Sequence, residues 1–346
     1  SLKISFKGDM KVLLTGATGF VGGEVIKHAA EAGHKVRVMA RNPARAEGLV
    51  KQFGVEVFHG NILAAPSLAG AMEGIDAVAH LVGIITEVNE MTFDRVHREG
   101  TINLLAEARR AKVKRWIQMS ALGVRPNARS RYHQSKWAAE EAVRAAPLDW
   151  TIVRPSVIYG RRDRFVNLFA GMMRFPRNLL QAFTVPAIGG GYSRMQPVPV
   201  EDVARVIVCA LDKPESFKKT YDLCGPQALR LREILLEIAA ALGHRGSLVG
   251  FPKLGRRWFG DGANVLLPLS VLLSIFRPKP LVVSVPWDFA EFLAWCLEMF
   301  TERPLLNRDQ LLMLEEDNVG DPAEAIKDFS IQPPSFGEGI RRYLSE

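Results

Sequence analysis

The sequence lacks several features that would assign it to a specialised class. Its three cysteines, Cys209, Cys224 and Cys296, form no C-x-x-C pair, which argues against a disulfide framework and a zinc knuckle and favours a reducing compartment. No run of five basic residues accompanies the net charge of +8, so we expect no nucleic-acid partner. The histidines show no metal-ligand spacing, and we predict no metal site.

Long apolar runs are also missing. The longest, residues 265–276, contains Pro268 and is shorter than the roughly 20 residues that a spanning helix needs. We interpret it as a buried or interfacial helix. No charged start followed by an apolar stretch opens the chain, so we expect no secretory signal and a cytoplasmic protein. Residues 1–9 precede Met10, and we interpret them as an N-terminal extension or a remnant of expression outside the fold.

The chain does have a regular alternation of short β-rich runs and helical periodicity, from Met10 to about residue 153. This pattern is typical of parallel strands joined by crossover helices. The predicted strands are nearly all apolar, as expected where both faces of a sheet are covered. We predict strands at residues 11–15, 35–40, 56–59, 77–81, 115–120 and 150–153, and helices at residues 20–32, 92–111 and 132–145. The predicted fold class is α/β, a doubly wound parallel Rossmann sheet.

The alternation ends after Arg154, where loops separate helical pieces. This change predicts a smaller, mainly helical C-terminal lobe. We expect a dinucleotide-binding domain over residues 10–160, and residues 197–225 would return to it through a helix at 201–211 and a strand at 220–223. The lobe for a substrate or partner would comprise residues 161–196 and 226–346.

A glycine-rich segment, KVLLTGATGFVGG, lies where the first strand ends and the first helix begins. There Gly16 permits a tight turn, Gly19 lets the backbone approach a pyrophosphate, and Gly22 allows close packing of helix and strand. The helix N-terminus would face the phosphates. A turn that is merely rich in glycine is the alternative. The predicted cofactor contacts of this segment are Gly16, Thr18, Gly19, Phe20, Val21 and Gly22.

The residue after the second strand bears on the choice of nucleotide. An NAD site usually has an acidic residue there, whereas this chain has Arg41. A guanidinium can pair with a 2′-phosphate and stack on adenine, which favours NADP(H) over NAD(H). A solvated loop arginine is the alternative. Asn61 and Ile62 follow the third strand and would border the adenine, although Asn61 could equally be a turn residue.

These segments together resemble the extended and atypical short-chain dehydrogenase/reductase superfamily, which includes the NAD(P)-dependent epimerases and dehydratases. TGATGFVGG, AVAHLVG, FDRVHREGTINLLAEARRAKVKRWIQMSALG, YHQSK, VRPSVIYG and QPVPVEDVA occur in that superfamily's order. The late segment RPLLNRDQLLMLEEDNVGD is similar to the branch that contains the alpha-subcomplex subunit 9 of respiratory complex I (NADH:ubiquinone oxidoreductase) and its bacterial relatives. The resemblance implies further cofactor contacts at Leu81, Val82, Gly83, Lys136, Pro155, Ser156 and Val157, whereas Pro155 could instead only shape the end of its strand.

The resemblance also implies a catalytic set. In catalytic members a Tyr and a Lys four residues later face the nicotinamide, and Tyr132 and Lys136 match this pair. The lysine lowers the pKa of the phenol, which then acts as general acid or base. Ser120 would polarise a substrate carbonyl, but the usual second hydroxyl residue is replaced by Ala121. A chance pair on an amphipathic helix is the alternative, and we expect His133 at the surface.

Three functions follow as hypotheses. The first is an NADP(H)-binding protein of the complex I accessory-subunit type, with a structural, assembly or quinone-related role and weak or no turnover. The second is an active NADPH-dependent reductase, epimerase or dehydratase acting on a quinone precursor, an isoprenoid or a nucleotide-sugar-like substrate. The third is a regulator that senses the NADPH/NADP ratio.

A basic and aromatic segment at residues 251–262 precedes the apolar run. Such a segment can rest on an anionic membrane surface or dock on complex I, which would make the protein peripheral to the inner membrane, on the matrix side in a mitochondrion. The alternative is a helix that closes the substrate lobe, with its basic residues solvated.

Overall fold

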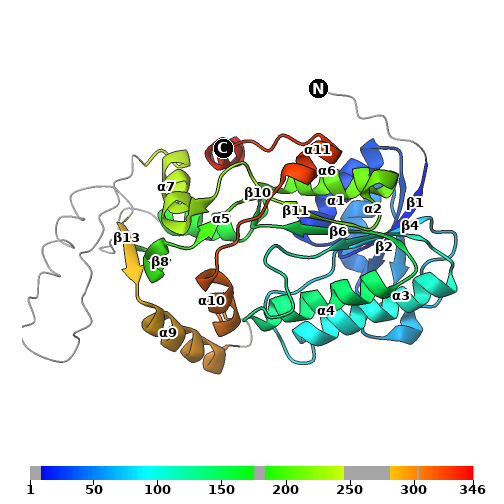
Figure 1. The fold of residues 1–346 in the computed structure, drawn as a ribbon, viewed down its shortest axis with the longest axis horizontal. Helices are drawn as coiled ribbons and strands as arrows, with labels where there is room; N and C mark the ends of the chain where they lie inside the picture. The colour runs from blue at the N-terminus through cyan, green and yellow to red at the C-terminus, as the bar shows by residue number, and fades with distance from the viewer. Residues whose placement is uncertain (1–8, 175–183, 245–280, 302–303, 346) are drawn as a thin grey trace, which may run out of the picture.

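The computed structural model describes residues 9–174, 184–244, 281–301 and 304–345. Its centre is a seven-stranded parallel sheet in the order β11-β6-β5-β4-β1-β2-β3 (Figure 1). This confirms the predicted doubly wound Rossmann fold. The strands are β1 (Lys11–Thr15), β2 (Lys35–Ala40), β3 (Glu56–His59), β4 (Ala77–His80), β5 (Arg115–Met119), β6 (Asp149–Pro155) and β11 (Lys219–Leu223).

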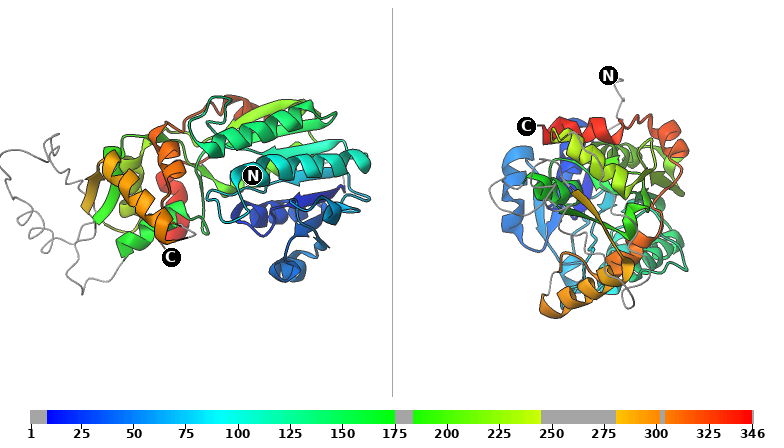
Figure 2. Two further views of the ribbon diagram at one scale, coloured as in Figure 1. Left: turned by 90° about the horizontal axis from the view of Figure 1, so that it is seen from below. Right: turned by 90° about the vertical axis from the view of Figure 1, so that its left-hand side faces the viewer.

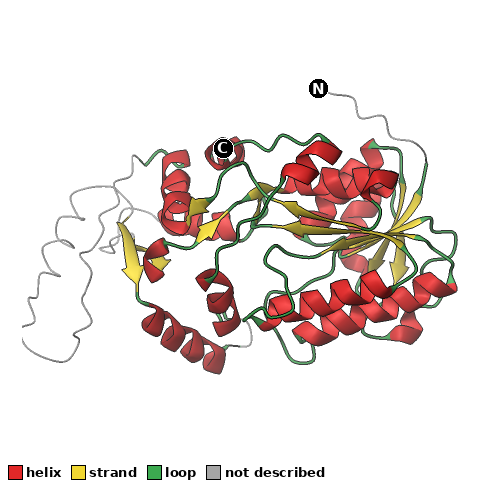
Figure 3. Cartoon of the chain, in the orientation of Figure 1, coloured by secondary structure: helices red, strands yellow, loops and turns green. Residues whose placement is uncertain are grey.

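Helices cover both faces of the sheet (Figure 3). On one face, α1 (Phe20–Glu31) packs against α6 (Val200–Leu211), and on the other α3 (Gly100–Arg110) packs against α4 (Arg131–Ala145). In β1, Val12 and Leu14 belong to the first core, while Leu13, between them, belongs to the second. Successive side chains of a strand point to opposite faces, so a strand buried on both sides needs the continuous apolar run found here.

From β1 and β4, at the centre of the sheet, successive strands are added in opposite directions. From β1 the chain proceeds outward through β2 and β3, and from β4 it proceeds the other way through β5, β6 and β11. The carboxyl ends of β1 and β4 are adjacent, with Thr15 opposite His80. This is the topological switch point at which open α/β sheets bind ligands.

One predicted helix differs in detail. Residues 92–111 were expected to form a continuous α-helix, but a π-helical segment, Asp94–Glu99, precedes α3. A π-turn widens the helix by one residue, and it turns His97 into the protein, where it is buried. The other predicted elements match the observed ones or differ from them by one or two residues at their ends.

The second lobe is mainly helical, as predicted (Figure 2). It contains a parallel strand pair, β8 (Thr184–Ile188) with β13 (Leu281–Val285). The other short strands outside the seven-stranded sheet are β7 (Ile158–Tyr159), β9 (Arg194–Met195), β10 (Val198–Pro199) and β12 (Leu229–Arg230). The helices of the second lobe are α5 (Phe165–Arg174), α7 (Leu231–Ala241), α9 (Trp287–Phe300), α10 (Arg308–Glu315) and α12 (Phe336–Leu344).

The chain returns to the first lobe after α10. Arg125 and Arg194 pair with Glu316 and Asp317 at 2.7 and 2.8 Å. The next helix, α11 (Ala323–Phe329), then lies against β11, where the Tyr221 hydroxyl donates to Asp328 at 2.6 Å. The apolar run 265–276 and the basic segment 251–262 lie outside the described residues. Among the helices that are described, none is long and apolar enough to span a bilayer.

Candidate functional site

The glycine loop after β1 has the backbone geometry that the sequence requires of it. Gly16 adopts a φ of +77°, a left-handed conformation that favours glycine. A Cβ on Gly22 would lie 2.5 Å from the carbonyl oxygen of Gly16. The loop therefore folds back onto the first turn of α1 at a distance that only glycine permits. Of the described side chains, none caps the N-terminus of α1, and its N–H groups are available to an anion.

The loop after β4 lies against this turn. A Cβ on Gly16 would be 3.0 Å from the carbonyl carbon of Leu81 and 3.1 Å from the nitrogen of Val82. On the far side, a Cβ on Gly83 would be 3.0 Å from Lys136 Nζ. The structure thus brings Leu81, Val82 and Gly83 between the glycine loop and the Lys136 amine.

The residues expected around the adenine lie beside β2 and β3. Arg41 is exposed, and its guanidinium contacts Met91 Sδ at 3.0 Å. The Asn61 side chain accepts from the N–H of Leu63 at 3.1 Å, as a turn residue does. Ile62 is buried against Gly100. Of these three side chains, only that of Arg41 is exposed to solvent.

Tyr132 and Lys136 lie one turn apart near the start of α4, and both are buried. The Tyr132 ring is surrounded by aromatic rings, with edge-on contacts to Phe93 at 5.9 Å, His97 at 5.4 Å and His133 at 5.3 Å. Within the described part of the chain, the Lys136 amine makes a single hydrogen bond, to the Met119 carbonyl at 3.2 Å. It can donate two more.

Burial shifts both pKa values away from the expected pattern. It raises the pKa of Tyr132 to about 12, and the negative charge of Asp309 adds to this effect. Burial also lowers the pKa of Lys136 to about 8, against the opposing influence of Glu140. The pKa of Tyr132 is thus shifted in the direction opposite to the expected lowering, because desolvation is the largest cause. Tyr132 is protonated at neutral pH and can donate a proton.

Ser120 follows β5 and is 3% exposed. Its hydroxyl has no hydrogen-bond partner among the described residues, which is costly for a buried polar group. Ser156, at the end of β6, is already engaged, because its hydroxyl lies 2.5 Å from the Asn318 side-chain oxygen. Pro155 and Val157 flank it in the chain. Of the two serines, only Ser120 has a hydroxyl free to meet a ligand.

A buried hydrogen-bond chain that the sequence did not reveal connects the glycine loop to α4. Thr15 lies 2.6 Å from His80 Nδ1, and His80 Nε2 lies 3.1 Å from the Thr101 hydroxyl. That hydroxyl donates to the His97 carbonyl. From His97 the chain continues through Nδ1 to the Ser135 hydroxyl at 2.8 Å and on to the Tyr132 carbonyl.

The tautomer of His97 follows from its neighbours. The N–H of Ile84 donates to Nε2 at 3.0 Å, so the proton of the neutral ring is on Nδ1. Burial, and next the charge of Lys136, lower the pKa of His97 to about 2. The ring is neutral and cannot act as a base, and it instead fixes the loop after β4 relative to α4.

The second lobe contributes Asp309, which the sequence also did not reveal. Its carboxylate accepts from the N–H groups of Arg131 at 2.7 Å and Tyr132 at 3.2 Å, so α10 caps the N-terminus of α4. His133 is buried and lies 2.9 Å from the Ser130 hydroxyl through Nδ1. The expected surface position of His133 is wrong, because its ring lies against Gly123 in the loop after β5 and against the Tyr132 ring.

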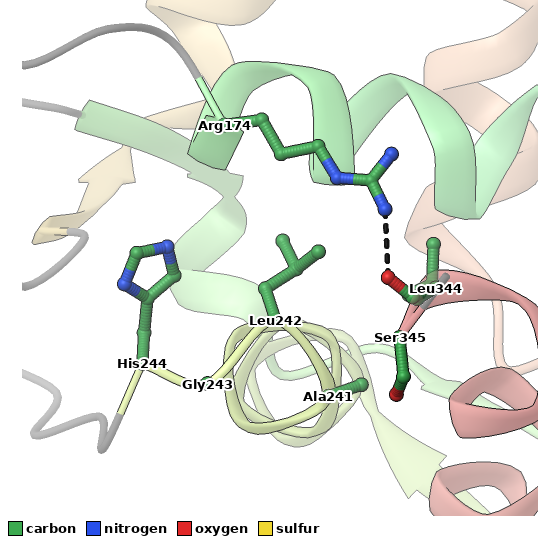
Figure 4. A pocket seen from close by; sticks show the side chains of 7 residues that line it. All are labelled: Arg174, Ala241, Leu242, Gly243, His244, Leu344 and Ser345. Atoms are coloured by element: carbon green, nitrogen blue, oxygen red, sulfur yellow. Dashed lines mark hydrogen bonds between the residues drawn. The ribbon is translucent and has the colours of Figure 1, made fainter.

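A separate hollow of about 530 Å³ lies in the second lobe, between the ends of α5, α7 and α12 (Figure 4). Arg174 crosses it and donates to the Leu344 carbonyl at 2.8 Å. None of the predicted site residues lines it, and it has no part in the chemistry of the switch point. The described residues include no cluster of three metal-ligating side chains.

The residues present fit a nicotinamide dinucleotide. The glycine bend and the free N–H groups at the N-terminus of α1 can bind a diphosphate. The two remaining donors of Lys136 and the unpaired hydroxyl of Ser120 can bind polar groups near the nicotinamide. A family model described as NAD(P)H-binding matches residues 16–168. A protein of Arabidopsis thaliana, the mitochondrial NADH dehydrogenase (ubiquinone) 1 alpha subcomplex subunit 9, is 32% identical over 326 residues, 92% of this chain and 73% of the relative.

The chain belongs to the family that contains this subunit. A ceramide reductase of Caulobacter vibrioides is 33% identical over 245 residues, 70% of this chain and 74% of that one. A solved dTDP-glucose 4,6-dehydratase from Streptomyces venezuelae shares the fold with a TM-score of 0.64 and 21% identity, covering 97% of this chain and 96% of that one. As a member of this family the chain is a nicotinamide-dinucleotide-binding protein.

Proposed function

We propose that the protein binds NADP(H) and that it is of the complex I accessory-subunit type. We further propose that it has weak or no turnover. The nucleotide would act mainly by stabilising the fold, because a ligand that binds only the folded state adds stability by mass action. The observation that carries this proposal is the contrast between an intact glycine bend and a Tyr132 enclosed by three aromatic rings and capped by α10.

The proposed choice of NADP(H) rests on Arg41. It is exposed after β2 and pairs with no carboxylate among the described residues, so its charge is available to a 2′-phosphate. Docking on respiratory complex I and peripheral attachment to an anionic membrane are part of the proposal. They are supported by the names of the mitochondrial relatives and by the basic, aromatic segment at residues 251–262.

Native mass spectrometry of the freshly purified protein tests the proposal. We expect one NADPH per chain and no oxidation of that NADPH by quinones or nucleotide sugars. Calorimetry should then give a dissociation constant that Tyr132→Phe leaves unchanged. Steady turnover that Tyr132→Phe abolishes would contradict the proposal, and so would a protein that takes up no pyridine nucleotide.

A second candidate function, an NADPH-dependent reductase, is favoured by the unpaired hydroxyl of Ser120. The nicotinamide would supply a hydride to a carbonyl carbon. Ser120 would hold the carbonyl oxygen, and Tyr132, protonated at neutral pH, would donate its proton to that oxygen. Lys136, with two donors left, would hold the ribose and balance the phenolate. A quinone precursor, an isoprenoid or a ceramide-like ketone would fit a buried, aromatic site.

Ser120→Ala separates the two functions. For a reductase we expect kcat to fall by roughly a hundredfold or more, since one donor to a developing oxyanion contributes this much. NADPH binding would be retained. For a non-catalytic protein the same substitution should change neither turnover nor NADPH affinity. In both cases the stability should rise slightly, because the substitution removes a buried hydroxyl that has no partner among the described residues.

A further inference from the structure

Helix α9 exposes its large apolar side chains to solvent and buries its small ones. Its inward face consists of Ala290 and Ala294, which are buried against Leu311 of α10. Its outward face carries large apolar side chains. Their exposed fractions are 57% for Phe289, 58% for Phe292, 45% for Trp295, 60% for Met299 and 85% for Phe300.

These side chains form one continuous face. Residues three and four apart are neighbours on a helix surface, and Phe289, Phe292, Leu293 and Cys296 follow that spacing. Leu305, which follows the helix in the chain, is also exposed, at 78%. An apolar patch of this kind marks an interaction site.

The acidic residues of α9 leave this face open. At 100° per residue, Glu291 and Glu298 share one flank of the helix, between the alanine face and the aromatic face. Glu298 is already paired with Arg308 at 2.7 Å. Only Asp288, in the first turn, stands beside the aromatic side chains.

From this face we infer that α9 is the surface by which the protein lies on an anionic lipid bilayer. Phe and Trp side chains suit the boundary between headgroups and acyl chains. The sequence that precedes β13 and α9 is basic, because residues 245–280 include six Lys or Arg and one Asp, and a basic sequence next to an apolar helix favours anionic lipid. In all three orientations α9 lies on the outside of the second lobe (Figures 1 and 2).

This inference rests on the proposed peripheral attachment, for which α9 would be the contact surface. It also connects that surface to the switch point, because α9 packs on α10 and Asp309 of α10 caps the helix that carries Tyr132. A lipophilic ligand that reaches the protein from the bilayer would therefore arrive one helix away from Tyr132.

Cosedimentation of the full chain with vesicles tests the inference. The α9 variant combines Phe289→Gln, Phe292→Gln and Met299→Gln, all at exposed positions where folding is least affected. The control variant combines Val50→Gln, Ile102→Gln and Ile326→Gln, which are exposed apolar residues of the first lobe. Vesicles consist of phosphatidylcholine alone or mixed equally with phosphatidylglycerol. NADPH affinity and solution mass are measured for every protein.

We expect binding to the phosphatidylglycerol vesicles, a loss of roughly tenfold or more in the α9 variant, and no change in the control variant or in NADPH affinity. Undiminished binding of the α9 variant would overturn this inference and leave peripheral attachment standing. A wild-type protein that binds no vesicle would overturn both, whereas NADPH binding would be unaffected. A dimer that the α9 variant dissociates would identify a second copy as the partner and would also overturn the inference.

Discussion

At the scale of single residues, the ionisation of Lys136 is determined by where the fold places it. The amine is buried and donates one hydrogen bond, to a neutral carbonyl. Glu140, the carboxylate whose charge acts on it, is bound by Arg144 and Arg154. Burial disfavours the charged form and lowers the pKa from 10.5 to about 8. The folded protein therefore binds this proton less tightly than the unfolded chain does.

This difference predicts a pH dependence of stability without cofactor. Between about pH 8 and pH 10.5 the unfolded chain binds more protons than the folded protein, so the free energy of unfolding rises with pH in that window. Below pH 8 Lys136 is charged in both states, and the full cost of burying its charge lowers the stability. We expect Lys136→Met to raise the free energy of unfolding at pH 7, by up to about 3 kcal/mol, with an advantage that shrinks by pH 9.5. Urea unfolding at both pH values measures this, and Lys114→Met is the control. An advantage that grows with pH would contradict it.

The nucleotide preference depends on another single residue, Arg41. Because its guanidinium would contact only the 2′-phosphate and the adenine, we expect Arg41→Ala to weaken NADPH binding by roughly tenfold to a hundredfold and NADH binding by much less. Calorimetry with both nucleotides measures the ratio. Lys51→Ala, at an exposed position of α2 (Glu47–Phe53), is the control. Equal losses for both nucleotides would show that Arg41 does not select the phosphate.

At the scale of elements, the cofactor loop depends on how closely α1 packs on the end of β1. A Cβ at position 22 would lie 2.5 Å from the Gly16 oxygen and 2.6 Å from the Ala17 Cα, and backbone atoms cannot give way as a flexible side chain can. We expect Gly22→Ala to cost roughly 1–3 kcal/mol of stability and to weaken nucleotide binding by more than tenfold, as measured by urea unfolding and calorimetry.

Gly48→Ala is the matched control for that substitution. Gly48 lies in α2 with no atom within 4 Å of its added Cβ, and alanine in a helix is favoured over glycine by about 0.5–1 kcal/mol. We therefore expect Gly48→Ala to be neutral or stabilising with unchanged nucleotide binding. If the two variants behaved alike, the close approach at Gly22 would not be what the site requires.

The sequence predicts the elements well where local rules decide them. Continuous apolar runs such as β1 and β4, and the glycines after β1, are sufficient to predict the sheet and its phosphate bend. The π-helical turn at Asp94–Glu99 has no such signature, because contacts across the fold, such as the bond from Ile84 to His97, hold it in place.

The site was harder to predict because tertiary contacts set its chemistry. Tyr132 and Lys136 were expected from their spacing, but the sequence gives no sign that a residue 177 positions later, Asp309, would cap Tyr132. The electrostatic surroundings of His133 arise in the same way, because the charge of Glu316, which acts on the buried ring, comes from a segment far along the chain. Pairings between lobes cannot be read from local periodicity.

At the scale of the whole molecule, the two lobes are held together by the chain that returns after α10. Arg125, Arg194 and Ser156 contact three successive residues, Glu316, Asp317 and Asn318. Nucleotide bound at the switch point should therefore stabilise both lobes.

We expect NADPH at a hundredfold excess over its dissociation constant to add about 2.7 kcal/mol to the free energy of unfolding. Hydrogen exchange should then slow in α7 and α12 as well as in the sheet, because global unfolding exposes both lobes together. Mass spectrometry of exchange, with and without NADPH, measures this for each helix. Two separate thermal transitions, only one of which responds to NADPH, would show that the lobes unfold independently.

The position of α11 on β11 has a consequence for synthesis. Phe329 packs on Tyr221 with ring centroids 4.9 Å apart, and Lys219 pairs with Asp328 at 2.9 Å, although the whole helical lobe separates these partners along the chain. While a ribosome is still translating that lobe, the Tyr221 ring on this edge strand lacks its Phe329 neighbour. An incomplete sheet edge is prone to mispairing, and we expect the nascent chain to bind chaperones until α11 emerges.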